Sequence, residues 1–158
     1  MQLTKDIKQY KAVFQADFGG IDKSILWVES HLAKTLRVRS FEEIIIDKIG
    51  LVMFESVSNI VEHSITHMSK INVYNKKINY IQSLRQRQQF CCFLEVGTRQ
   101  IRIKILYPFK PHFTFDLREK NVLGGRGEHI IKAMGVKVRR SVDYVKKTAV
   151  LTLYMPYV

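Results

Sequence analysis

The stretch FEEIIIDKIGLVMFESVSNIVEHS, Phe41–Ser64, has the strongest helical pattern of the chain, and the other predicted elements are arranged around it. In front of it, Ser40 and Glu43 have the spacing of a capping box, in which each side chain satisfies a free backbone N–H group of the other's residue. Apolar residues then recur at helical spacing, which predicts one face buried against a larger structure. The residues of this face are Ile46, Ile49, Met53, Val57 and Ile60.

Polar side chains follow the edge of that apolar face. At about 100° per residue, an α-helix places them within one narrow arc. Such a stripe is either the wall of a binding site or a solvated helix face, and the solvated face is the commoner case. The residues of this stripe are Glu55, Asn59, Glu62 and His63.

A glycine-rich run forms the second signal, about sixty residues later. Gly124-Gly125-Arg126-Gly127 leads directly into Glu128–Met134, which has the pattern of an amphipathic helix. Clustered glycines let the backbone approach an anion, and a helix N-terminus supplies free N–H groups and a partial positive charge. A loop that needs positive φ angles has the same composition, and the spacing differs from that of a dinucleotide-binding turn.

Together, the two stretches resemble the GHKL ATPase superfamily, which contains gyrase, histidine kinases and anti-sigma factor kinases. Phe54–His63, FESVSNIVEH, is similar to the ExxxNxxxH-type motif of that superfamily, and Gly124–Gly127 is similar to its later glycine box. The order and separation of these motifs most resemble the small anti-sigma factor serine kinases. The resemblance extends from about Tyr10 to Tyr154.

The resemblance implies a role for each matching residue. Glu55 would be the general base that takes the proton from a substrate serine or threonine hydroxyl. Asn59 would bind Mg²⁺, which bridges and neutralises the triphosphate. The implied cofactor is ATP or ADP with Mg²⁺, and the implied cofactor-binding residues are Asn59, His63, Gly124, Gly125, Arg126 and Gly127.

The implied function is that of a partner-switching regulator. Such a protein binds a sigma factor and a STAS-type antagonist, and it phosphorylates the antagonist as a serine/threonine-protein kinase. The resembled kinases commonly form homodimers. A surface of Phe14, Phe18 and Trp27 on the first strand and helix offers an aromatic interface for such a dimer, although these residues can equally be internal.

One motif of the superfamily is missing. Its DxGxG box, in which the Asp binds the adenine amino group, is replaced here by Tyr107–Pro111, YPFKP. Tyr107 stands at the Asp position, and Phe109 and Pro111 stand at the two glycines; recruiting Asp116 requires a forced alignment. Without the carboxylate, the site lacks a hydrogen bond to a charged group, which would contribute about 1.5 to 3 kcal/mol to nucleotide binding. The alternative function is therefore a degenerate, non-catalytic protein-interaction module with weak or no nucleotide binding.

Length and composition favour a single domain spanning residues 1–158, because 158 residues with 46% hydrophobic side chains suffice for one full core. The N-terminus has no apolar signal core, and no run is long enough to span a bilayer, so a soluble, cytoplasmic protein is expected. Cys91 and Cys92 are adjacent, so on a strand they point to opposite faces and do not form an ordinary disulfide.

Positive charge dominates the composition. Lys and Arg number 26 against 14 for Asp and Glu, a net charge of +12. This charge suits nucleic acid, an anionic membrane or an acidic protein partner. No nucleic-acid-binding motif accompanies it, so direct nucleic-acid binding is not the expected function. His63 and His67 share a helix face, but two histidines do not complete a zinc site, and no structural metal is expected.

The remaining elements follow from periodicity. Alternation over Tyr10–Phe18 predicts a strand that ends at Gly19–Gly20, and a helix follows from about Asp22 or Ser24 to Leu36. A short strand or helix is expected near Ile78–Leu84 within the polar segment Thr66–Gln89.

Two hairpins complete the chain. They consist of strands 90–96 and 101–107 and of strands 138–144 and 149–154. About three helices on a mostly antiparallel sheet make an α+β two-layer sandwich. This architecture agrees with the Bergerat fold that the resemblance implies.

Overall fold

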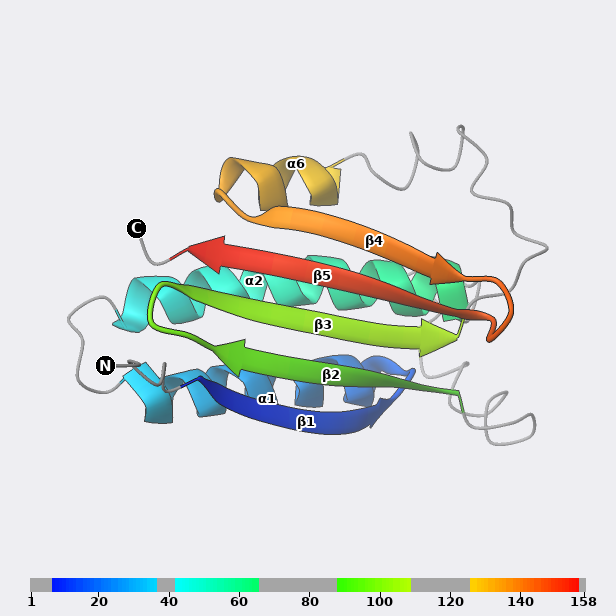
Figure 1. The fold of residues 1–158 in the computed structure, drawn as a ribbon, viewed down its shortest axis with the longest axis horizontal. Helices are drawn as coiled ribbons and strands as arrows, with labels where there is room; N and C mark the ends of the chain where they lie inside the picture. The colour runs from blue at the N-terminus through cyan, green and yellow to red at the C-terminus, as the bar shows by residue number, and fades with distance from the viewer. Residues whose placement is uncertain (1–6, 37–41, 66–87, 109–125, 157–158) are drawn as a thin grey trace, which may run out of the picture.

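An antiparallel sheet with helices on one face forms the protein in the computed structural model, which describes residues 7–36, 42–65, 88–108 and 126–156 (Figure 1). The strand order is β1-β2-β3-β5-β4, and every neighbouring pair is antiparallel. The strands are β1 (Lys8–Gln15), β2 (Gln89–Val96), β3 (Gln100–Pro108), β4 (Lys137–Asp143) and β5 (Thr148–Pro156). The predicted α+β two-layer architecture is confirmed.

Three α-helices belong to the described residues, and they lie in the order α1 (Phe18–Leu36), α2 (Glu42–Asn59) and α6 (Arg126–Ala133). A π-helical segment, η1 (Ile60–Ile65), continues α2 without a break. In Figure 1, α1 and α2 run behind the sheet, and α6 lies beside the edge strand β4.

The start of α1 differs from its prediction. The strand ends at Gln15 and the helix begins at Phe18, so Gly19 and Gly20 lie in the first helical turn. Asp17 acts as the N-cap, because its Oδ1 accepts a hydrogen bond of 2.7 Å from the backbone N–H of Gly20. A Cβ at position 20 would lie 1.7 Å from the Gln15 carbonyl oxygen. This glycine therefore lets the helix fold back closely onto the end of β1.

The predicted central helix is confirmed over most of its length. Ile49, Met53, Val57 and Ile60 are buried, as their spacing predicted, and Ile46 is half-buried. The proposed capping residue Ser40 and the side chain of Glu43 lie outside the described residues. The difference is at the C-terminal end, where α2 gives way to the π-helical segment η1.

Both predicted hairpins are confirmed. β2 and β3 are joined through Gly97, whose N–H donates to the Gln100 carbonyl at 3.0 Å. In the second turn, Oδ1 of Asp143 accepts hydrogen bonds of 3.0 Å from the N–H groups of Val145 and Lys146. The predicted element near Ile78–Leu84 lies outside the described residues.

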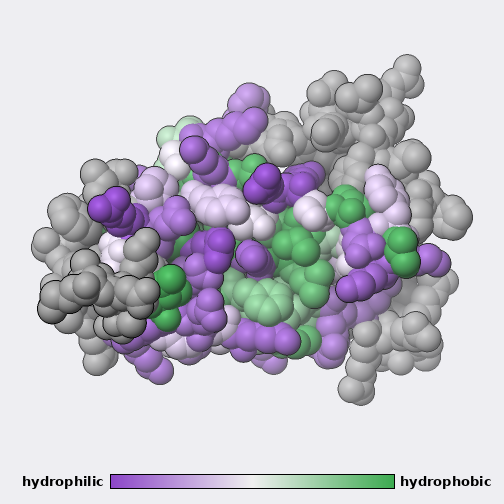
Figure 2. Space-filling model, in the orientation of Figure 1, coloured by the Kyte–Doolittle hydropathy of each residue, from purple (hydrophilic) through white to green (hydrophobic). Residues whose placement is uncertain are grey.

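The two faces of the sheet differ in burial. The face toward the helices carries the core, which includes Leu94, Ile103 and Leu151, all at most 3% exposed. No element of the described residues covers the opposite face, here called the open face, which looks toward the reader in Figures 1 and 2. Cys92 is buried on the core side, whereas Cys91 is half-buried on the open face, and both are free thiols, as predicted.

Candidate functional site

The two elements that carry the sequence motifs lie against each other. α2 contains Glu55 and Asn59, and α6, which follows the glycine run, packs on α2. α2 and β3 run toward the same end of the molecule, and α6 begins on the side that faces this end (Figure 1). The fold therefore places the helix motif and the helix after the glycine box in one region.

The glycine box is described only in part. The run leads into a helix, as predicted, but α6 begins at Arg126, two residues before Glu128. Arg126 and Gly127 therefore belong to the first turn of the helix. Gly124 and Gly125 lie outside the described residues, and so does the side chain of Arg126.

Glu55 and Asn59 lie one turn apart on α2, and both are half-buried, so they border the core as predicted. The helical geometry changes directly after Asn59, where η1 begins. The predicted polar arc assumed α-helical geometry through His63, but a π-helix bonds each residue to the fifth along the chain instead of the fourth. Glu62 is therefore rotated away from the position assumed for it, and the His63 side chain lies outside the described residues.

The last turn of α2 contains two buried hydroxyl groups. Ser56 is 3% exposed and Ser58 is 2% exposed. In the part of the chain that the structure describes, neither Oγ has a hydrogen-bond partner. The end of α2 therefore combines two buried hydroxyl groups with the start of a π-helical segment, and π-helical turns frequently occur at functional sites.

Tyr107 is the residue that the sequence resemblance aligns with the adenine-binding Asp of the resembled family. It lies near the end of β3 on the core side of the sheet, is only 3% exposed and belongs to the core cluster. η1 packs against this strand. A phenol ring, not a carboxylate beside an open recess, therefore fills this position. The Tyr107 side chain does not offer the carboxylate with which the resembled family binds the adenine ring. Phe109, Pro111 and Asp116 lie outside the described residues.

Potential metal ligands are dispersed over the described part of the chain. There, no group of three or more His, Cys, Asp and Glu side chains is placed to hold a metal ion. Asn59, which the resemblance implies as the Mg²⁺ ligand, is half-buried at the end of α2, and His67 lies outside the described residues.

The proposed aromatic dimer surface is only partly exposed. The rings of Phe14 and Trp27 meet edge to face with 5.8 Å between centroids, and Phe14 also packs on Phe90 at 5.6 Å. These two rings pack between the sheet and α1 and are half-buried, so part of each ring stays accessible. Phe18 is 42% exposed at the start of α1. The homodimer itself stays a prediction.

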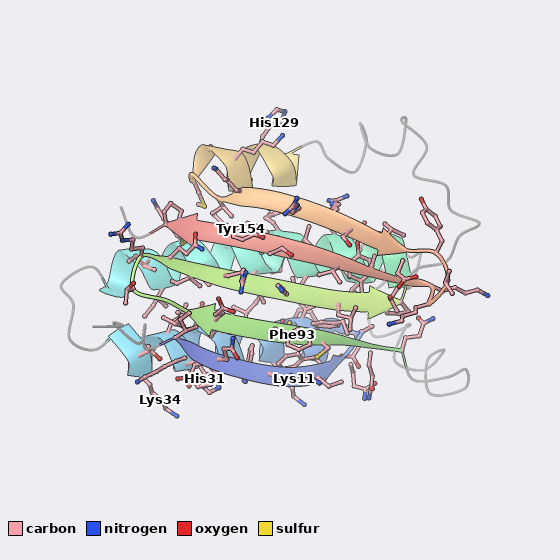
Figure 3. The ribbon with its side chains drawn as sticks, in the orientation of Figure 1. Lys11, His31, Lys34, Phe93, His129 and Tyr154 are labelled. Atoms are coloured by element: carbon pink, nitrogen blue, oxygen red, sulfur yellow. The ribbon has the colours of Figure 1, made fainter. Side chains whose placement is uncertain are left out.

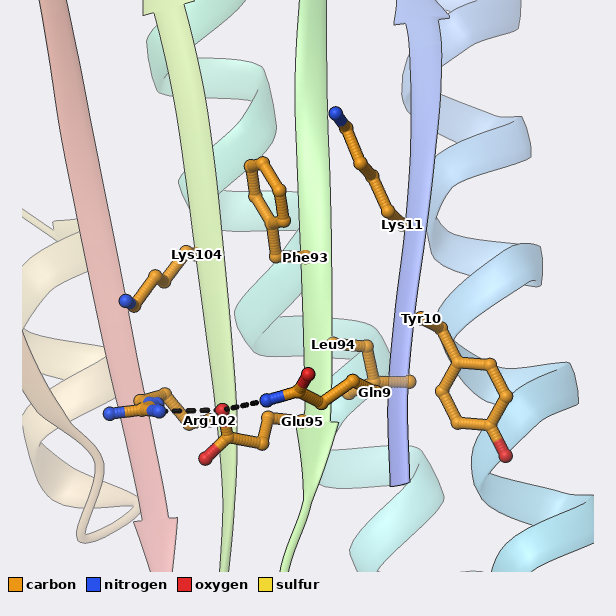
Figure 4. Close-up of a pocket in the computed structure, with 8 residues that line it drawn as sticks. All are labelled: Gln9, Tyr10, Lys11, Phe93, Leu94, Glu95, Arg102 and Lys104. Carbon is orange, nitrogen blue, oxygen red and sulfur yellow. Dashed lines mark hydrogen bonds and ion pairs between the residues drawn. The ribbon is translucent and has the colours of Figure 1, made fainter. Parts of the chain in front are cut away.

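A groove on the open face was not predicted from the sequence. It has a volume of about 460 Å³ and lies over β1, β2 and β3 (Figure 4). At one end, the Arg102 guanidinium donates a hydrogen bond to Glu95, which also accepts one of 3.2 Å from Gln9 Nε2. The groove is lined by Gln9, Tyr10, Lys11, Phe93, Leu94, Glu95, Arg102 and Lys104.

In the sequence, the signal for this groove is the set of residues at the outward-facing positions of each alternating strand. Phe93 stands at an outward position of β2, where a polar residue is usual. Its neighbours across the sheet are Lys11 and Lys104, and Lys11 is far away in the sequence. Strand pairing was needed to bring the three together.

Comparison with known proteins gives no assignment. A scan against models of known protein families finds no match, and a search of curated proteins finds none either. In the described part of the chain, no helix combines the length and apolar character needed to cross a membrane.

Proposed function

We propose that the chain is a partner-switching regulator of the GHKL type that works as a protein-interaction module, with weak or no nucleotide binding. The burial of Tyr107 in the core is the observation that carries this proposal. A carboxylate that binds adenine must stand at the rim of a recess, but this ring is packed among core residues. By resemblance, the partners are a sigma factor and a STAS-type antagonist.

A specific observation favours the kinase as a second candidate. Glu55 and Asn59 remain half-buried at the end of α2, next to a π-helical turn, instead of being sealed in the core. That exposure suits a base and a metal ligand that must meet a substrate. Under this candidate, the chain binds ATP with Mg²⁺ and phosphorylates the antagonist.

Calorimetry with ATP, ADP and GTP in the presence of Mg²⁺ separates the two candidates. The interaction module predicts undetectable binding, or weak binding with little preference for adenine, because a phosphate site does not depend on the base. Micromolar affinity for ATP with strong preference over GTP would overturn the module and restore the kinase.

A matched pair of variants tests the role of Tyr107. Tyr107→Val shortens the side chain but keeps a residue that suits a strand, whereas Tyr107→Phe keeps the ring and removes only the hydroxyl. If the ring blocks the recess, Tyr107→Val gains nucleotide affinity and Tyr107→Phe does not. Equal affinities of both variants and the parent chain would show that the ring is not the obstacle. Denaturant unfolding of both variants verifies that each is folded.

A further inference from the structure

The register of the five strands sorts the open face into rows that cross the sheet. One row reads Val13, Cys91, Leu106, Val150 and Ser141 from β1 to β4, so it is mostly apolar. The next row, here called the basic row, consists of Lys11, Phe93, Lys104, Thr152 and Arg139. A third row contains Gln9, Glu95, Arg102, Tyr154 and Lys137.

The basic row contains cations and an aromatic ring but no carboxylate. Lys11 Nζ lies 5.4 Å from the centroid of the Phe93 ring, and Lys104 is the direct neighbour of Phe93 on the other side. Figure 4 shows Phe93 standing between these two lysines. Lys104 and Arg139 are exposed. The ring therefore lies between two positive charges.

Acidic groups do little to offset this charge. Across the three rows, the single carboxylate is Glu95, and it is already paired with Arg102 at 2.5 Å. Five cations, namely Lys11, Arg102, Lys104, Lys137 and Arg139, share the same surface. The face is thus strongly positive, in a chain with a net charge of +12.

Aromatic rings lie in two neighbouring rows of the open face. Phe93 is half-buried on β2, and Tyr154 is half-buried on β5, one row away (Figure 3). Figure 2 shows apolar side chains in the middle of this face with hydrophilic ones around them. Beside Phe93, the groove of about 460 Å³ has a volume within the range of small-ligand sites.

We infer that the open face binds single-stranded nucleic acid, with a base stacked on Phe93 and the phosphates held by the cations of the basic row. Flat rings on a sheet surface are platforms for unpaired bases, and lysine and arginine follow the phosphate backbone. A second copy of the chain fits less well, because a face-to-face contact would oppose like charges. Nucleic-acid binding was not expected from composition, because a net charge by itself defines no surface.

The test is fluorescence anisotropy with labelled oligo(U) and oligo(dT) of about 12 nucleotides. The full chain is compared with a row variant, Lys11→Gln/Lys104→Gln/Arg139→Gln. A matched control, Lys23→Gln/Lys34→Gln/Lys48→Gln, removes the same charge from exposed positions on α1 and α2, on the other side of the molecule. Binding is measured at about 50 and 200 mM salt.

The row variant should bind at least about tenfold more weakly, and the slope of log affinity against log salt should fall by about 2 in magnitude. The helix control should change affinity by less than about twofold. Phe93→Leu keeps an apolar side chain but removes the ring, and a loss of about tenfold is expected from lost stacking.

Three results would overturn the inference. Equal loss in the two triple variants would mean that net charge alone attracts the probe. Unchanged affinity in Phe93→Leu would exclude stacking on that ring. Absence of binding by the parent chain at the lower salt would refute the site, and dimer dissociation of the row variant in sedimentation would then assign the face to a second copy.

Discussion

Arg102 on β3 and Glu95 on β2 form an ion pair across neighbouring strands, at 2.5 Å between guanidinium nitrogen and carboxylate oxygen. Both side chains stand on the open face, and neither is fully exposed. The hydrogen bond from Arg102 lowers the pKa of the Glu95 carboxyl, assisted by the charges of Arg102 and Lys104 and by Gln9, while burial acts in the opposite direction. This ion pair therefore keeps Glu95, the single carboxylate in the three rows of the open face, in contact with Arg102.

This ion pair predicts that the effect of Glu95→Gln on the stability of the fold depends on pH. A carboxyl with a lowered pKa stabilises the folded state above its unfolded pKa, and this stabilisation is lost as pH falls through the folded pKa. Glu95→Gln should lower the free energy of unfolding by about 1 kcal/mol at neutral pH. The difference should shrink toward zero well below the ordinary glutamate pKa.

Denaturant unfolding at neutral pH and at pH values well below the ordinary glutamate pKa measures the difference in the free energy of unfolding between Glu95→Gln and the parent chain. Asp47→Asn, at an exposed position of α2, removes the same charge from the helical side of the molecule and serves as the control. A gap between Glu95→Gln and the parent chain that persists in acid would contradict the ion pair as its source.

The close approach of α1 to β1 predicts that substitution by alanine destabilises the chain much more at Gly20 than at Gly19. Gly20→Ala places a methyl group 1.7 Å from the Gln15 carbonyl oxygen, so the helix start must shift. We expect a loss of about 3 kcal/mol or more in the free energy of unfolding. At Gly19, the nearest atom to the new methyl group is Asp17 Oδ1 at 3.4 Å. Gly19→Ala should therefore change stability by less than about 1 kcal/mol. Similar losses of stability in both variants would mean that the close approach of position 20 to the Gln15 carbonyl oxygen does not determine the cost of the substitution.

The adjacent thiols should react very differently. Burial raises the pKa of the Cys92 thiol strongly, and the neighbouring Cys91 adds to this effect. Burial also raises the pKa of Cys91, partly offset by Lys11. Iodoacetamide should thus modify Cys91 slowly, with a rate that rises in alkaline solution, and should leave Cys92 intact until the chain unfolds. Mass spectrometry counts the adducts. Cys91→Ser should abolish labelling of the folded chain, and rapid labelling of Cys92 would contradict its burial.

Glu55 gives a prediction that applies under the kinase candidate. Glu55→Ala should abolish any phosphotransfer and leave the fold largely intact, because this half-buried side chain borders the core instead of filling it. Phosphate incorporation into the antagonist is the measurement. Lys48→Ala, at an exposed position of the same helix, is the control. Activity that survives in Glu55→Ala would show that another group acts as the base.

Self-association is a separate prediction. A homodimer is expected by resemblance, and sedimentation at tens of micromolar measures its mass directly. Phe14 and Trp27 are half-buried and Phe18 is the most exposed of the three aromatic residues, so Phe18→Ser should weaken a dimer through the start of α1. A monomer mass at every concentration would refute the dimer.

Much of the fold could be predicted from the sequence because it rests on local periodicity. The apolar spacing in α2, the alternation in β2 and β3, and the turns of both hairpins depend on residues close together in the chain. The predicted start of α1 was wrong for an identifiable reason. Gly19 and Gly20 have the composition of a break, but their role depends on the carbonyl of Gln15, against which the helix packs.

Local patterns were enough to predict the order and type of the described strands and α-helices, the buried face of α2 and the opposite orientation of the two thiols. The core position of Tyr107, the π-helical turn after Asn59 and the basic row became visible only in the folded chain. The four residues Lys11, Phe93, Lys104 and Arg139 are scattered over more than half of the sequence. They meet because antiparallel pairing places distant residues about 5 Å apart between strands, and this register depends on the packing of the whole sheet against its helices.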